Sequence, residues 1–123
     1  MPDSVETVFV YGTLRRGGSN HHRLQGAEFV ATATVRGRLY RIDWYPGLVA
    51  DENAGEVIGE IHQVPATMLA ALDDYEGPEY RRVKMDVRTS RREDPPCRAW
   101  VWLWDGPVDE SRHIAGGDWL ALT

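Results

Sequence analysis

The chain has 123 residues, which is the size of one domain, and we expect a single domain over residues 1–123. A hydrophobic fraction of 42% and a charged fraction of 27% are ordinary for a globular domain and exclude a disordered, fibrous or coiled-coil chain. The 19 Asp and Glu residues outnumber the 14 Lys and Arg residues, and the net charge of −5 disfavours binding to nucleic acid through phosphate contacts.

Cysteine content and hydropathy indicate in which cellular compartment the protein is expected. Cys97 is the single cysteine, which excludes an internal disulfide and a zinc site built from several cysteines. No apolar run reaches the roughly 20 residues that span a bilayer. Residues 1–6 are acidic and polar, where a secretory signal would be basic and then apolar. We therefore expect a cytoplasmic protein with no membrane partner, while the oligomeric state stays unknown.

Six or seven short segments have the composition of β-strands. The 12 Gly and seven Pro residues spread along the chain separate these segments and favour a strand-rich fold. In chain order, strands are predicted over residues 7–11, 29–34, 35–42, 57–64, 80–87 and 98–104, and residues 48–50 are a further short apolar segment. A charged hairpin loop is predicted over residues 88–96.

Two helices are predicted between these strands. Ser19 or Asn20 is suited to cap a short helix that ends before Gly26. The stronger helix opens at Pro65, continues over residues 66–75 with good helix formers, and stops at Gly77.

The last predicted strand has no face suited to water, because Trp100, Trp102 and Trp104 alternate with apolar residues. A closed or heavily covered sheet explains such a strand. Six or seven strands with one or two helices therefore predict an α+β fold, a small barrel with the helix closing one side. We expect the tryptophans to pack in the core or at an interface.

Glu76 breaks a local rule, because it lies at the C-terminal end of the predicted helix, where the helix dipole disfavours negative charge by up to about 1 kcal/mol. Met68, Leu72 and Glu76 recur every four positions on the apolar stripe that should face the sheet. A carboxylate in that place is desolvated, so its pKa rises toward the range of a general acid or base. The alternatives are that Glu76 turns outward or pairs with Arg81 or Arg82.

The segment Tyr11-Gly12-Thr13-Leu14 follows the first predicted strand. Glycine in such a turn lets successive backbone N–H groups point toward one place and bind an anion or an oxyanion. The alternative is a plain turn at the end of a strand, which is common.

Other polar residues offer weaker candidates. The segment Arg15-Arg16-Gly17-Gly18 lacks the ending of a phosphate loop, which excludes a nucleotide site, and charged loops of this kind are usually solvated. Cys97 has no helix N-terminus to activate its thiol. Glu60 is a candidate second buried carboxylate, with an ion pair across the sheet as the simpler explanation. The histidines have no metal-ligand spacing and are expected at the surface or in capping roles: His21, His22, His62 and His113.

The order of several short motifs is more specific than any one of them. The motifs are Val8-Phe9-Val10-Tyr11-Gly12-Thr13-Leu14, Gly18 and Asn20, Tyr45-Pro46-Gly47-Leu48, Gly59-Glu60-Ile61, and Leu72-Asp73-Asp74-Tyr75-Glu76-Gly77 followed by Tyr80 and Arg82. In this order the chain resembles the gamma-glutamylcyclotransferase-like family, of the small gamma-glutamylamine cyclotransferase type, over residues 8 to 104. The resemblance implies a small mixed, largely antiparallel β-barrel with flanking helices, no metal and no cofactor.

The resemblance also implies an activity and its residues. The family cyclises a gamma-glutamyl group by attack of its α-amine on the γ-carbonyl, which gives 5-oxoproline and releases an amine or amino acid. The acidic catalyst of the family matches Glu76. The substrate-binding residues implied for this sequence are Tyr11, Gly12, Thr13, Leu14, Tyr80 and Arg82. The implied partner is therefore a small gamma-glutamyl substrate and not a nucleic acid.

These inferences give one enzyme hypothesis and one rival. The rival is a noncatalytic module that uses the same cavity to bind a small carboxylate or another protein. A binder of an anion gains nothing from an acid directed into its pocket, so Glu76 favours the enzyme. The enzyme hypothesis requires the turn from Tyr11 to Leu14 and Glu76 to line one cavity.

Overall fold

The computed structural model describes residues 4–90 and 96–122. Its strands are β1 (Val5–Val10), β2 (Glu28–Arg41), β3 (Pro46–Ala50), β4 (Glu56–Pro65), β5 (Tyr80–Thr89) and β6 (Cys97–Trp104). Its α-helix is α1 (Met68–Glu76), and three short 3₁₀ helices are η1 (His21–Leu24), η2 (Glu110–Arg112) and η3 (Trp119–Leu122).

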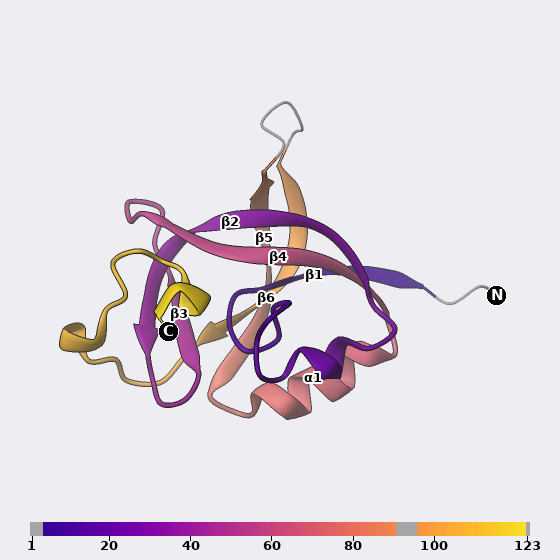
Figure 1. Cartoon of the computed structure of the whole chain (residues 1–123), viewed down its shortest axis with the longest axis horizontal. Helices are drawn as coiled ribbons and strands as arrows, with labels where there is room; N and C mark the ends of the chain where they lie inside the picture. Colours follow the sequence, from indigo (N-terminus) through magenta and orange to yellow (C-terminus); the bar gives the residue numbers. More distant parts are fainter. Residues whose placement is uncertain (1–3, 91–95, 123) are drawn as a thin grey trace.

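The strands close into a barrel (Figure 1). The order is β3-β2-β4-β1-β6-β5, and an additional pairing of β2 with β5 joins the two sides. β1 and β6 run parallel, with Val8 opposite Trp100, and the other pairs are antiparallel. The predicted α+β fold with a mixed, largely antiparallel barrel is therefore confirmed.

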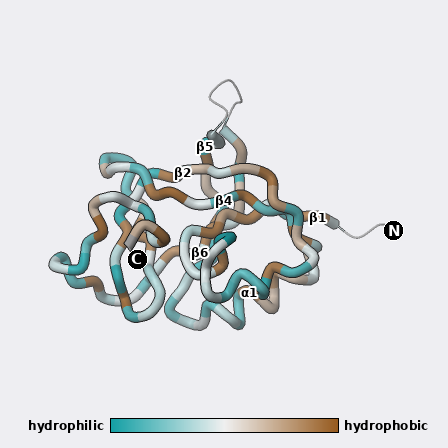
Figure 2. The backbone as a smooth tube through the Cα atoms, in the orientation of Figure 1, coloured by the Kyte–Doolittle hydropathy of each residue, from teal (hydrophilic) through white to brown (hydrophobic). Residues whose placement is uncertain are grey.

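Successive residues of the same strand belong to different apolar clusters. Phe9 packs in a cluster to which every strand contributes, whereas Val8 and Val10 pack with Leu72 of α1 in a second cluster. Figure 2 shows hydrophobic segments, in brown, along β2, β4 and α1. In β6, Trp102 belongs to the helix-side cluster and its neighbours to the other, so the expected absence of a solvated face is confirmed there.

The two strands predicted over residues 29–34 and 35–42 are one strand of 14 residues, β2. The prediction of a break was wrong because the segment from Thr34 to Arg36 has no Gly or Pro and pairs without interruption with β4. The irregularity lies instead between Phe29 and Ala31, where the register with β4 shifts.

The helix boundaries differ at one end. Pro65 is the last residue of β4, opposite Val5, and α1 begins only at Met68, so Pro65 does not open the helix as predicted. Gly77 ends α1 with φ of 92°, as predicted. The predicted short helix is the 3₁₀ helix η1, and Asn20 caps it without a side-chain hydrogen bond. Of the predicted loop over residues 88–96, the part 91–95 lies outside the described residues.

Candidate active site

A cavity of about 150 Å³ lies where the loop after β1, the segment before β3, the end of α1 and the start of β5 meet. Its lining residues are Phe9, Val10, Tyr11, Gly12, Thr13, Leu14, Trp44, Tyr45, Pro46, Tyr75, Glu76, Tyr80 and Trp102. The prediction that the turn after the first strand and Glu76 line one cavity is confirmed. Among the described residues, this lining contains one ionisable carboxylate and no Lys, Arg or His.

Within the described part of the chain, the loop after β1 contributes three consecutive residues with unpaired backbone N–H groups to the cavity lining. Gly12, Thr13 and Leu14 are buried, yet their N–H groups donate no hydrogen bond to any residue in 4–90 or 96–122. A turn in which Arg15 N–H donates to the Gly12 carbonyl at 3.1 Å holds the loop. Buried N–H groups are almost always paired, so three unpaired donors beside a cavity are suited to an anionic ligand.

Gly12 lies very close to the facing wall of the cavity. A Cβ atom at this position would be 2.7 Å from Cγ of Pro46 and 2.8 Å from its Cδ. Only glycine lets the loop and the Pro46 ring approach so closely.

Glu76 is the last residue of α1, on the stripe that also carries Leu72. Burial, and secondarily the carboxylate of Asp73, raise the pKa of Glu76 to about 7. Within residues 4–90 and 96–122 its carboxylate has no hydrogen bond and no ion pair. The alternative in which Glu76 pairs with Arg82 is wrong, because Arg82 Nε donates to Oδ1 of Asp73 at 2.9 Å.

Asp73 also fixes the aromatic wall. Its Oδ1 accepts a hydrogen bond from Trp102 Nε1 at 2.8 Å, in addition to the one from Arg82. The end of α1 is thereby tied to β6 and β5. Arg82 is directed to Asp73 and to the Trp100 ring, 4.5 Å from its centroid, and is absent from the cavity lining.

The tyrosine hydroxyls of the cavity bond to protein groups. Tyr11 donates to the Trp102 carbonyl at 2.7 Å, and Tyr80 donates to the Pro46 carbonyl at 2.5 Å. Thr13 Oγ1 and the Tyr75 hydroxyl are 2.6 Å apart. Burial is the first cause that raises the pKa values of the three tyrosines, with the nearby Glu76 charge as a further cause. They are therefore neutral hydrogen-bonding groups that shape the cavity, and Glu76 is its group suited to proton transfer.

Comparison with known proteins agrees with this geometry. Residues 8–121 match the family described as gamma-glutamyl cyclotransferase, AIG2-like. The gamma-glutamylcyclotransferase family protein YtfP of Escherichia coli K12 is 33% identical over 116 residues, which cover 92% of this chain and 95% of that protein. The chain belongs to the gamma-glutamyl cyclotransferase, AIG2-like family. It is thus an enzyme of the gamma-glutamylcyclotransferase type, as the resemblance implied.

Two further relatives extend the comparison. The gamma-glutamylaminecyclotransferase of Rattus norvegicus is 37% identical over 94 residues, which cover 66% of this chain and 62% of that protein. The crystal structure of an AIG2-like protein from Mus musculus superposes with a TM-score of 0.77 at 26% identity, covering 86% of this chain and 81% of that one. An uncharacterized protein from Pyrococcus horikoshii has the same TM-score at 27% identity, with coverage of 95% and 92%.

For this gamma-glutamyl cyclotransferase family member, the structure brings together six of the seven predicted site residues. Tyr11, Gly12, Thr13, Leu14, Tyr80 and Glu76 line the cavity. Arg82 does not line the cavity and donates a hydrogen bond to Asp73 instead. The lining residues that the sequence analysis did not single out as site residues are Phe9, Val10, Trp44, Tyr45, Pro46, Tyr75 and Trp102. Two signals could have found some of them, because Tyr45-Pro46 belongs to a family motif and Tyr75 precedes Glu76.

Three polar residues differ from the expectations. His62 is 2% exposed and contacts Glu60, so its predicted surface role is wrong. Arg15 is buried and not solvated. Glu60 is buried, as considered, but its cationic partners come from the loop after β1 and not from across the sheet.

The metal and membrane questions concern only the described part of the chain. Residues 4–90 and 96–122 contain no group of three or more His, Cys, Asp or Glu residues placed to hold a metal ion. None of the helices in these ranges is long and apolar enough to cross a membrane.

Proposed function

We propose that this protein converts gamma-glutamyl amines or peptides into 5-oxoproline and a free amine or amino acid, with Glu76 as the general acid and base. The observation that carries the proposal is the pairing, across one cavity, of the unpaired N–H groups of residues 12–14 with the unpaired carboxylate of Glu76. The relatives named gamma-glutamylcyclotransferase and gamma-glutamylaminecyclotransferase support it. A cytoplasmic location is part of the proposal and rests on the sequence alone.

The substrate contributes its own nucleophile. Its α-amine and γ-carbonyl are tethered at the distance of a five-membered ring, so the protein has only to fold the chain and move protons. In this proposal the free N–H groups of residues 12–14 bind the α-carboxylate and stabilise negative charge on the carbonyl oxygen, which is supported by their place in the cavity lining and their lack of partners among the described residues.

One carboxylate is sufficient for the proton transfers. Ionised Glu76 removes a proton from the α-ammonium group, and the amine then forms the new C–N bond at the γ-carbon. The protonated carboxyl returns that proton to the leaving nitrogen as the old C–N bond breaks. The ring nitrogen then loses its second proton through the same carboxylate to the released amine, which departs as an ammonium ion. Glu76 ends in the form in which it began, and no oxidant, reductant or further reactant is consumed.

The pH dependence of turnover tests the role of Glu76. Because burial and Asp73 raise the pKa of Glu76 to about 7, the active carboxylate is lost as the pH falls through that value. We expect kcat/KM to fall about tenfold per pH unit below pH 6. A rate profile from pH 5 to pH 9 checks this, and a rate that is flat down to pH 5 would contradict a base with this pKa.

A substrate panel tests the activity and separates it from the binding-module rival. The purified protein is incubated with gamma-glutamyl amines, gamma-glutamyl dipeptides and the matching β-aspartyl compounds, and 5-oxoproline is quantified by chromatography. We expect release from at least one gamma-glutamyl compound and none from the β-aspartyl controls, whose chain is one carbon too short for a five-membered ring. Tight binding of these compounds without turnover would favour the noncatalytic module.

A further inference from the structure

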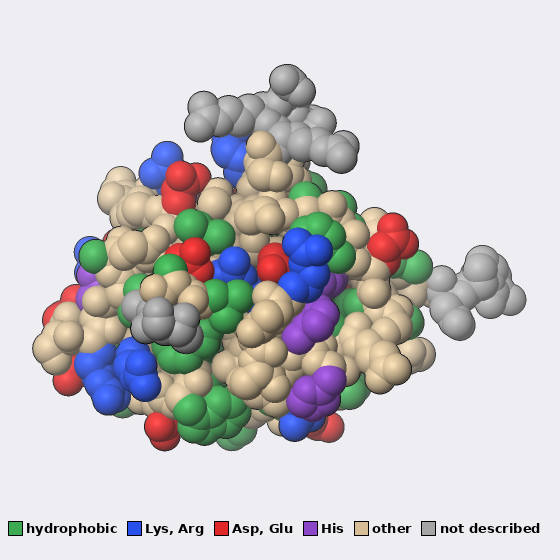
Figure 3. All heavy atoms as spheres, viewed as in Figure 1, with side chains coloured by type: hydrophobic (Ala, Val, Ile, Leu, Met, Phe, Trp, Pro, Cys, Tyr) green, Lys and Arg blue, Asp and Glu red, His purple; other side chains and the backbone are tan. Residues whose placement is uncertain are grey.

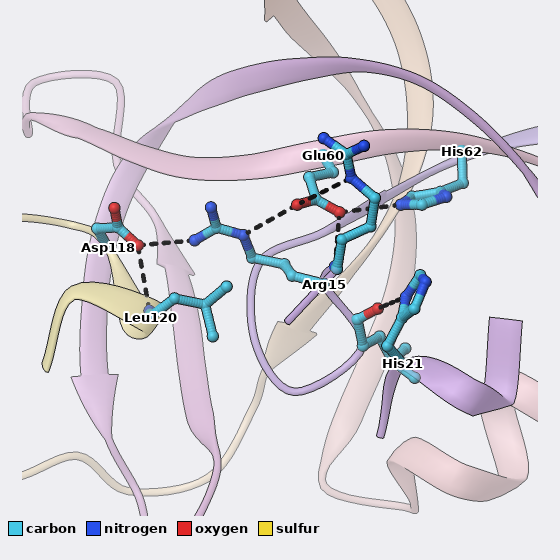
Figure 4. A network of polar contacts seen from close by, with 8 residues as sticks. Arg15, His21, Glu60, His62, Asp118 and Leu120 are labelled. Carbon is cyan, nitrogen blue, oxygen red and sulfur yellow. Dashed lines mark hydrogen bonds and ion pairs between the residues drawn. The ribbon is translucent and has the colours of Figure 1, made fainter. Parts of the chain in front are cut away.

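Glu60 is a buried carboxylate that the proposed chemistry does not use. It lies in β4, is 4% exposed, and is opposite Val10, the last residue before the candidate anion-binding loop. Its Oε1 accepts the backbone N–H of Arg16 at 2.9 Å and lies 3.1 Å from His62 Nε2, and its Oε2 lies 3.7 Å from Arg15 Nε. Figure 4 shows these groups converging on Glu60.

Arg15 connects Glu60 to the C-terminal segment of the described chain. Its guanidinium is buried and reaches Oδ1 of Asp118 at 2.7 Å, an oxygen that also accepts the Leu120 N–H at 3.1 Å. Arg15 Nε has no hydrogen-bond acceptor among the described residues, so the Glu60 charge 3.7 Å away is its nearest compensation. The loop after β1 is thus held by β4 on one side and by the C-terminal segment on the other.

The charge of Glu60 is maintained by this loop. Burial by itself would raise the pKa of Glu60, but the hydrogen bonds from His62 and from the Arg16 N–H, together with the Arg15 charge, lower it below its ordinary value. Two of these three compensating groups belong to residues 15 and 16. Removing the carboxylate would therefore leave the Arg16 N–H unpaired and would leave Arg15 with Asp118 as the anionic partner that it keeps.

We propose that Glu60 is a positioning residue, which holds the loop after β1 so that the free N–H groups of Gly12, Thr13 and Leu14 stay at the cavity wall. The proposal rests on the proposed function for its effect on turnover. Glu60 does not line the cavity. It acts through Arg15 and Arg16.

The loop is compact enough to transmit this restraint. Arg15 N–H closes the turn on Gly12, and Asn20 N–H donates to the Thr13 carbonyl at 2.9 Å. A Cβ atom on Gly18 would lie 2.8 Å from the Thr13 carbonyl carbon, so the backbone folds tightly around Thr13. A displacement at residues 15 and 16 must therefore move residues 12–14.

The network lies close to the surface, where the side chain of Arg16 is half-exposed. Figure 3 shows Arg and His side chains, in blue and purple, beside one another on this face. Arg16 has a half-exposed side chain and stacks on Phe29, 3.4 Å from the ring centroid, while its backbone N–H stays on Glu60. The hydrogen bond from the Arg16 backbone N–H, and not the exposed guanidinium, therefore attaches this residue to Glu60.

Two variants and a matched control test the proposal. Glu60→Ala removes the acceptor of the Arg16 N–H, whereas Glu60→Gln keeps an oxygen acceptor and removes only the charge. Glu56→Gln changes an exposed carboxylate in the same strand, whose hydrogen bond is to Thr34. Each variant is compared with the wild type well below its melting temperature, so that only folded protein is measured.

Binding of two small molecules separates positioning from general damage. 5-Oxoproline carries the carboxylate that the loop would bind, and 2-pyrrolidinone is the same ring without it. We expect Glu60→Ala to weaken 5-oxoproline binding and raise KM for a gamma-glutamyl amine by about tenfold or more. 2-Pyrrolidinone binding should weaken less, because its neutral carbonyl gains less from the N–H groups of residues 12–14 than a carboxylate does. The effects of Glu60→Gln should be smaller than those of Glu60→Ala, and Glu56→Gln should match the wild type. Equal weakening of both rings, or a lower melting temperature with unchanged KM, would overturn the proposal.

Amide hydrogen exchange measures how firmly the loop after β1 is held, and it needs no substrate. We expect the Arg16 amide to exchange at least about tenfold faster in Glu60→Ala, because its acceptor is gone, with a smaller change in Glu60→Gln. Unchanged exchange in both variants means that Glu60 does not hold the loop. If the wild type neither releases nor binds 5-oxoproline, the proposed function fails, and the exchange result still decides whether Glu60 positions the loop.

Discussion

Replacing Glu76 by glutamine should lower the rate of 5-oxoproline release by about 10²- to 10⁴-fold, because the amide keeps the shape of the side chain and cannot take up or return a proton. Substrate binding should change little, since the N–H donors of residues 12–14 are untouched. The measurement is kcat and KM on the best substrate of the panel. Glu79→Gln, which changes an exposed carboxylate three residues further on, is the matched control and should keep full activity. A stable, fully active Glu76→Gln protein would exclude Glu76 as the acid–base residue.

The same variant should become more stable, and the gain should depend on pH. The pKa of Glu76 is about 7 in the folded protein against an ordinary 4.5, so the folded state binds the proton more tightly. The contribution of protonated Glu76 to the free energy of unfolding is therefore complete below about pH 4.5, and it is lost as the pH rises through 7. We expect Glu76→Gln to match the wild type near pH 4.5 and to exceed it at pH 8 by on the order of 1–3 kcal/mol. Thermal melts at the two pH values check this, and equal destabilisation at both would indicate that the carboxylate has a structural partner.

Gly12→Val should lower kcat/KM by about 10²-fold even when the variant is fully folded, because a side chain at this point obstructs the donors of the loop. The collision of a Cβ atom with the Pro46 ring at 2.7 Å should also lower stability, by about 1–3 kcal/mol. Assays well below the melting temperature, with circular dichroism to confirm folding, separate the two effects.

A control for this variant is available in the same chain. A Cβ atom on Gly55 would have no neighbouring atom within 4 Å, and the φ of Gly55 is not positive, so Gly55→Val should leave kcat/KM at the wild-type value. If folded Gly12→Val also keeps the wild-type value, the segment after β1 is a plain turn and binds no part of the substrate.

Local patterns were sufficient to place Glu76. The four-residue spacing from Leu72 and the glycine after it both act within one helix, and the structure has Leu72 buried and Gly77 with positive φ. Alternation likewise identified β6, since its apolar residues on both faces require cover on both sides. The closure of the barrel follows from that requirement.

Long-range polar contacts were beyond such reasoning. Arg15 looks like a solvated loop residue in sequence, and it is buried because Asp118, 103 positions away, reaches it. Arg82 sits beside a family motif, yet its position is decided by Asp73 on another element. His62 is enclosed by Glu60 and the Phe29 ring. No periodicity within a segment encodes which distant side chain will satisfy a charge.

The parallel pairing of β1 with β6 has a consequence for the time course of folding. The loop after β1 depends on partners from the other end of the chain, because Tyr11 bonds to Trp102 and Arg15 to Asp118, which are 91 and 103 positions apart. Such contacts form only after a large loop of chain has closed, which costs entropy, so they slow the rate-limiting step of folding. During synthesis, β1 emerges early and must wait for β6, with its apolar residues unprotected meanwhile. Catalytic competence should therefore be acquired late in folding, and it should lag behind helix formation in a refolding experiment.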